Sequence, residues 1–83
     1  MSQIDPKYKY YLCDLGYLLK TRALEVKQEL QKVIKDSPDH HFQAGRLIAF
    51  NEVISLMQQQ ASAFIVPLED LRLEDIDPDR DLV

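Results

Sequence analysis

Apolar residues recur along the first part of the chain at the spacing of an amphipathic helix. At about 100° per residue, the apolar positions between residues 8 and 34 fall within an arc of roughly 160°, which is one side of a helix. Asp5 and Pro6 offer an N-cap and a first-turn proline, and Pro38 sets the stop, because the residue before a proline avoids the helical region. We therefore predict a first helix over residues 6–36.

A second helical pattern follows almost at once. Ser37 and Pro38 provide an N-cap and a first-turn proline, and Pro67 ends the pattern. The apolar residues from Leu47 to Ile65 cover roughly 200° of the circumference, which is more than one neighbouring helix can bury. The pattern predicts a helix over residues 38–65 that packs antiparallel against the first, so that residues 1–66 form a helical hairpin.

The last seventeen residues, 67–83, form a segment of different composition. They carry seven acids and two bases, a net charge of −5, whereas residues 1–66 carry +1. Their apolar residues alternate irregularly with the acids, which suits a short turn of helix or an extended strip. We expect this acidic C-terminal extension either to fold back over the hairpin as a cover or to serve as an acidic peptide ligand for a basic partner.

Two helices cannot bury two such wide apolar faces against each other. In a chain of 83 residues, the simplest additional cover is a second copy of the same chain. We therefore predict an all-α, antiparallel two-helix hairpin that forms a homodimeric four-helix bundle. The candidate dimer-core residues are Leu15, Leu19, Val26, Leu47, Phe50, Ile54, Met57 and Phe64.

A second stripe lies on the opposite side of the first helix. Tyr10, Tyr17 and Leu24 are spaced by seven. The stripe is either ordinary tolerated exposure or a docking strip for the extension or another protein, since tyrosine combines apolar area with a polar tip. Together with Leu71, Leu73 and Ile76 of the extension, these residues are the candidates for partner binding.

The acidic and histidine clusters do not have the spacing of a metal site. The aspartates at 75, 77, 79 and 81 resemble the start of a calcium loop, but its sixth position is Arg80 instead of glycine. His40 and His41 are adjacent, so on a helix they point about 100° apart. We expect no metal ion and no cofactor, and we interpret these clusters as a solvated acidic end and a polar turn.

The sequence offers no pattern typical of catalysis. Cys13 is the single cysteine and has Asp14 beside it instead of a base. Gly16 and Gly45 are isolated, so neither belongs to a phosphate-binding loop, and each marks a tight packing point or a tolerated defect. We therefore expect no catalytic residues and a chain that is not an enzyme.

Nucleic-acid binding is the alternative function. Lys9, Lys20 and Lys27 fall near one line of the first helix and favour contact with phosphates. The isoelectric point of about 5.0 disfavours it, because nucleic-acid domains are usually strongly basic. The chain has no apolar run of membrane-spanning length and does not begin like a signal peptide, so we expect a cytoplasmic protein without membrane contact.

The second half of the chain carries a resemblance. The stretch GRLIAFNEVISLM from Gly45 to Met57, the LEDL at 68–71 and the DPDRDL at 77–82 resemble short bacterial helical proteins of unknown function. The resemblance implies a small bacterial protein without an assigned site and makes Arg46 and Glu52 candidates for surface or intersubunit ion pairs. From these patterns we expect a protein-interaction or regulatory module whose partner is itself or another protein.

Overall fold

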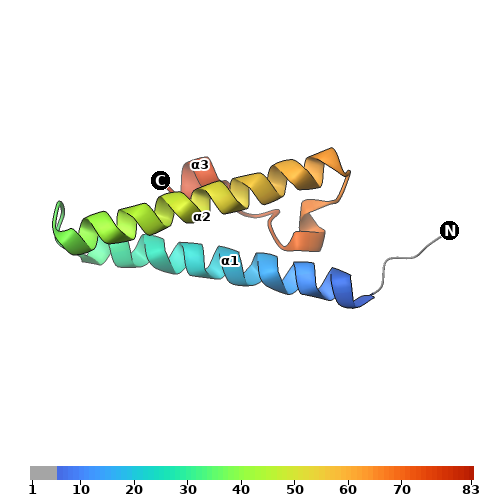
Figure 1. Cartoon of the computed structure of the whole chain (residues 1–83), viewed down its shortest axis with the longest axis horizontal. Helices are drawn as coiled ribbons and strands as arrows, with labels where there is room; N and C mark the ends of the chain where they lie inside the picture. Colours follow the sequence, from blue (N-terminus) through green and yellow to red (C-terminus); the bar gives the residue numbers. More distant parts are fainter. Residues whose placement is uncertain (1–5) are drawn as a thin grey trace.

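The computed structural model describes residues 6–83, and over that range the chain is helical without strands (Figure 1). Helix α1 (Pro6–Lys32) and helix α2 (Pro38–Ala63) pack antiparallel as the predicted hairpin. The remaining residues contain a single 3-10 turn, η1 (Leu68–Leu71), and a short helix, α3 (Pro78–Asp81). The prediction of an all-α hairpin with a short C-terminal extension is therefore confirmed.

The turn between the two long helices begins earlier than predicted. Helix α1 ends at Lys32 instead of residue 36, because reversal of the chain needs residues 33–37 and places Asp36 in the left-handed region at φ 64°. Helix α2 begins as predicted, with the Ser37 hydroxyl accepting a hydrogen bond from the His40 N–H at 3.1 Å and Pro38 in its first turn. The predicted cap of α1, Asp5, lies outside the described residues.

Helix α2 ends two residues before the predicted position. The Val66 N–H donates to the Ala61 carbonyl at 2.8 Å, which is the long-range bond of a Schellman motif. Ile65 occupies the left-handed position of this motif at φ 55°, where glycine is usual, and its side chain is 91% exposed. The motif turns the chain so that the segment after Pro67 runs back along the hairpin.

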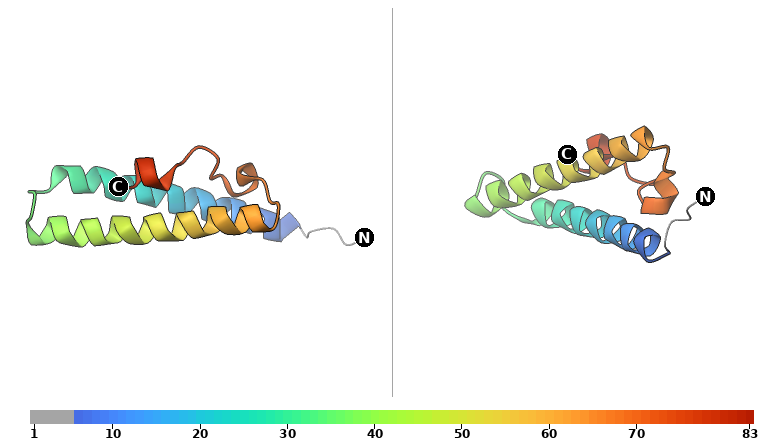
Figure 2. Two further views of the ribbon diagram at one scale, coloured as in Figure 1. Left: turned by 90° about the horizontal axis from the view of Figure 1, so that it is seen from above. Right: turned by 45° about the vertical axis from the view of Figure 1, so that its right-hand side comes forward.

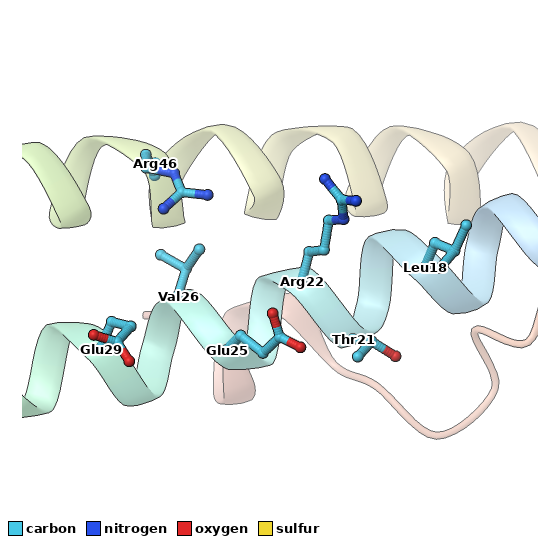
Figure 3. Close-up of a pocket in the computed structure, with 7 residues that line it drawn as sticks. All are labelled: Leu18, Thr21, Arg22, Glu25, Val26, Glu29 and Arg46. Carbon is cyan, nitrogen blue, oxygen red and sulfur yellow. The ribbon is translucent and has the colours of Figure 1, made fainter.

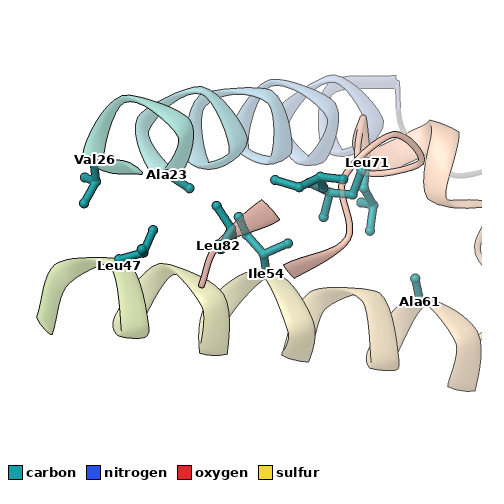
Figure 4. Packing of buried hydrophobic residues seen from close by; sticks show 9 residues of the cluster. Ala23, Val26, Leu47, Ile54, Ala61, Leu71 and Leu82 are labelled. Atoms are coloured by element: carbon teal, nitrogen blue, oxygen red, sulfur yellow. The ribbon is translucent and has the colours of Figure 1, made fainter. Parts of the chain in front are cut away.

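Residues 67–83, here called the tail, lie along one face of the hairpin (Figure 2). η1 contacts α1, and α3 contacts α2. The tail contributes four of the nine residues in the buried apolar core (Figure 4), which are Ala23, Val26, Leu47, Ile54, Ala61, Leu71, Leu73, Ile76 and Leu82. In this structure the tail therefore acts as a cover, which is one of the two roles expected for it.

A close backbone approach brings the start of the tail onto α1. Gly16 is buried, and a Cβ built on it would lie 1.8 Å from the carbonyl oxygen of Leu71. Only glycine allows the tail backbone to come this near to the helix. Gly45 has no atom within 4 Å of its corresponding position, so it is a tolerated exposed glycine.

Two amide side chains of α2 bind the backbone of the tail. Gln58 donates to the carbonyl oxygens of Leu73 at 3.1 Å and Ile76 at 2.9 Å. Asn51, seven residues earlier, donates to the carbonyl of Pro78 at 2.8 Å. The bonds from Gln58 satisfy two tail carbonyl groups outside regular secondary structure, whereas the Pro78 carbonyl also accepts from the Leu82 N–H at 3.0 Å within α3.

Candidate protein-interaction surface

The face of the hairpin opposite the tail is uncovered. The tail contacts α1 at Gly16 and Lys20 and α2 at Asn51 and Gln58. Another side of each helix is marked by positions that alternate at spacings of three and four residues, which places them in one line along the helix. We call these positions the open face; they are Tyr11, Leu15, Leu18, Arg22, Glu25 and Glu29 of α1 and Arg46, Phe50, Val53, Met57, Gln60 and Phe64 of α2.

One half of the open face is apolar. It lies where α1 begins and α2 ends, and it contains large side chains that are half exposed or more, including Leu18 at 51% and Phe64 at 75%. A groove of about 240 Å³ lies next to it, between the two helices, and its lining includes Leu12, Met57 and Phe64 together with Gln60 and the tail residue Leu71. Such a continuous apolar surface is typical of a protein contact.

The other half of the open face is charged and lies toward the turn. Arg22, Glu25 and Glu29 of α1 and Arg46 of α2 line a groove of about 420 Å³, with Val26 between the helices (Figure 3). Within residues 6–83 neither Arg22 nor Glu25 forms an ion pair. This half therefore presents unpaired charges of both signs beside an apolar surface.

The predicted partner-binding residues divide into two groups. Tyr10, Tyr17 and Leu24 lie on the exposed side of α1, and the guanidinium of Arg72 in the tail sits 5.8 Å from the ring centre of Tyr17. The stripe thus contacts the edge of the tail without being covered by it. The tail residues of the prediction, Leu71, Leu73 and Ile76, are buried in the core of the chain itself and are not presented to a partner in this structure.

The predicted dimer-core residues are also divided. Val26, Leu47 and Ile54 are buried inside the hairpin, so they hold the single chain together. Leu15, Leu19, Phe50 and Met57 are half-buried, and Phe64 is exposed. The candidate list omitted Tyr11, Leu18 and Val53, whose three-and-four spacing on one side of each helix is the signal that identifies the open face.

Two aspartates of the tail, Asp77 and Asp81, accept the capping hydrogen bonds at the start of α3. The Asp77 carboxylate accepts from the Asp79 N–H at 3.1 Å, and the Asp81 carboxylate accepts from the Asp77 N–H at 2.9 Å. Asp81 also accepts hydrogen bonds from Arg80, and these bonds together with the one from the Asp77 N–H lower the pKa of Asp81 to about 2. Among residues 6–83 no group of three histidine, cysteine or acidic side chains is placed to hold a metal ion.

His40, His41 and Cys13, the other residues considered for metal binding or catalysis, each lie against another side chain. The rings of His40 and His41 meet edge to face at 5.8 Å at the start of α2. Cys13 is half-buried beside Arg72, and this contact raises the pKa of Arg72. Neither arrangement brings together a nucleophile and a base.

Two of the three lysines on the line along α1 hold the tail. Lys20 pairs with Asp75 at 2.8 Å and keeps only 13% of its side chain exposed, and this hydrogen bond lowers the pKa of Asp75. The Nζ of Lys27 donates to the carbonyl oxygen of Val83. The acidic tail therefore occupies much of the surface that a phosphate backbone would need.

Comparisons of the chain with protein-family models, with curated proteins and with solved structures found no match. The resemblance to short bacterial helical proteins and the cytoplasmic location therefore stay predictions. No helix within residues 6–83 is both long enough and apolar enough to cross a lipid bilayer.

Proposed function

We propose that this chain is a non-enzymatic protein-interaction module that acts as a homodimer through its open face. The observation that carries the proposal is the contrast between the two faces of the hairpin. The tail covers one face with four core residues, and the opposite face carries large apolar side chains without cover from residues 6–83.

The exposed apolar side chains of the open face favour a contact with another chain. Tyr11, Leu18, Val53 and Phe64 are all exposed in the single chain. A standard protein interface buries about 800 Å² on each partner, and these side chains would form its apolar centre.

A second copy is the partner that fits the shape of this surface. Alternating spacings of three and four on both helices are the pattern that packs helices side by side in a bundle. Two hairpins joined through their open faces would make a four-helix bundle with the tails on its outside. We propose that such a dimer acts as a small adaptor or regulator, because it would offer two copies of every outer surface to other proteins.

The test compares charged substitutions on the two sides of α1. We expect sedimentation equilibrium to give a dimer for the wild-type chain and for Leu24→Glu, and a monomer for Leu18→Glu. Leu18 and Leu24 are both partly exposed, so circular dichroism should show the same helix content in all three proteins. A wild-type chain that stays monomeric, or a Leu18→Glu variant that dimerises as well as Leu24→Glu, would refute the proposal.

The alternative function, nucleic-acid binding, has less support from the contacts. Lys20 and Lys27 are engaged by the tail, and within residues 6–83 Lys9 alone of that line forms no hydrogen bond or ion pair with it. A gel shift at low salt with mixed RNA and DNA tests this alternative, because phosphate contacts are strongest there. Binding that falls steeply with added salt would favour it over the proposed function.

A further inference from the structure

The open face has a direction, because its apolar half and its charged half lie at opposite ends of the hairpin. Tyr11, Leu18 and Phe64 belong to the apolar half, toward the start of α1. Glu25 and Arg46 belong to the charged half, toward the turn. Two copies that meet through this face can therefore pack with like halves together or with unlike halves together.

Two symmetric arrangements join the open faces of two hairpins. In the first, the two-fold axis runs along the helices, so both turns lie at the same end and α1 packs against α2 of the partner. In the second, the axis runs across the helices, so the turns lie at opposite ends and α1 packs against α1 of the partner. Neighbouring helices are antiparallel in both, so helix direction alone does not distinguish them.

The positions of the charges along the hairpin favour the first arrangement. Val26 lies level with Leu47 in the core (Figure 4), and Arg46 lines the same groove as Glu25 and Glu29 (Figure 3). Packing α1 against the partner's α2 therefore places each Arg46 opposite Glu25 and Glu29 of the partner. The same rotation places Leu18 opposite the partner's Val53, so apolar surface meets apolar surface.

The second arrangement brings unlike halves together. The charged half of one copy would lie on the apolar half of the other, and Glu25, Glu29 and Arg46 would lose water without gaining ion pairs across the interface. Burying a charge without a partner is strongly unfavourable. The pairing of charges and the burial of apolar surface therefore both favour the first arrangement.

Resting on the proposed function, we infer that two copies pack open face to open face with their turns at the same end, α1 against the partner's α2, and Arg46 paired with Glu25 and Glu29 across the interface. The two ion-pair clusters fix the register of the bundle. The apolar half supplies most of the buried surface.

Disulfide cross-linking tests this geometry. In a Cys13→Ser background, Leu18→Cys and Val53→Cys are made as separate proteins, mixed, allowed to exchange subunits and oxidised. The inference predicts that mass spectrometry finds mainly disulfides between position 18 of one protein and position 53 of the other. Cross-links mainly between two copies of position 18, or equal yields of all pairs, would overturn it.

Charge reversal gives an independent readout. Arg46→Glu alone and the double variant Glu25→Arg with Glu29→Arg should each weaken dimerisation about tenfold or more, because like charges then face each other. Mixing the two should restore a heterodimer of near wild-type affinity. Lys35→Glu, in the turn and off the open face, is the matched control and should dimerise normally.

The outcomes separate the two claims. A wild-type dimer with the wrong cross-links, or with charge variants that fail to rescue each other, refutes this arrangement and leaves the homodimer standing. A wild-type monomer by sedimentation equilibrium refutes both.

Discussion

Replacing Gly16 with alanine tests whether the tail truly packs on α1. The new Cβ would lie 1.8 Å from the Leu71 carbonyl oxygen and 2.9 Å from its carbon. The obstacle is backbone, so it cannot turn aside as a flexible side chain can. To bring the separation to 3.0 Å, the tail must retreat from the helix by more than 1 Å.

The expected magnitude follows from two opposing effects. Alanine in place of glycine inside a helix stabilises it by about 0.5–1 kcal/mol. Forcing packed segments apart costs about 1–3 kcal/mol, and here the buried Leu71 and Leu73 move with the backbone. The two effects together allow a net loss of up to about 2.5 kcal/mol, and because the obstacle is backbone we expect Gly16→Ala to lower the free energy of unfolding by about 1–2 kcal/mol.

Gly45→Ala is the matched control, because it is the same change in the middle of a long helix with no atom near the new Cβ. It should raise the free energy of unfolding by about 0.5–1 kcal/mol. Urea unfolding followed by circular dichroism measures both variants, at one protein concentration because a dimer's stability depends on it. If Gly16→Ala were as stable as Gly45→Ala, the close contact between the tail and α1 would not exist in solution.

Three further predictions concern the tail and Ile65, which lies just before it. Ile65→Asn should raise the free energy of unfolding by about 1 kcal/mol, because asparagine tolerates the left-handed region and the isoleucine is almost fully exposed; an unchanged or lower urea midpoint would contradict this. Gln58→Leu should lower it by about 1–2 kcal/mol, because the carbonyl groups of Leu73 and Ile76 lose their donor, whereas Gln59→Leu on the exposed side should have little effect. The pKa of Asp81 is about 2 in the fold and 3.8 in its ordinary state, so the ionised carboxylate stabilises the fold above pH 3.8, and this stabilisation is lost as the pH falls toward 2. Asp81→Asn should therefore make the free energy of unfolding depend less on pH between 3.8 and 2. A variant with the same pH dependence as the wild type would argue against the cap.

The hairpin was predictable because its signals are local. Helical spacing and the Ser37-Pro38 cap together fixed two helices and their order. The end of α1 was placed too late because Val33 and Ile34 continue the apolar spacing. Spacing carries no information on how many residues the chain needs to reverse its direction.

The position of the tail was left open by the sequence for a physical reason. Apolar spacing shows which residues avoid water, but it does not show what covers them. The irregular run of Leu71, Leu73 and Ile76 fits a cover and a ligand equally well. Leu82, one of the most deeply buried residues, was not singled out, because an apolar residue that follows three charged residues in a row has no periodic signal.

For a similar reason, the sequence pattern did not separate the face that the tail covers from the open face. A wide apolar arc on α2 contains both the side that meets the tail and the side that stays open. Asn51 and Gln58 separate them, since both are polar side chains within the half-buried surface that bind tail carbonyls. Only the folded chain shows which polar residues have this role.

The most direct test of an open face covered by a second copy is methyl NMR with a soluble paramagnetic agent at high protein concentration. Leu18 and Val53 on the open face, and Leu24 and Leu56 on the outer sides of the helices, are all substantially exposed in the single chain. We predict that the methyl signals of Leu18 and Val53 are protected from the agent while those of Leu24 and Leu56 are strongly broadened. Equal broadening of all four would contradict the account.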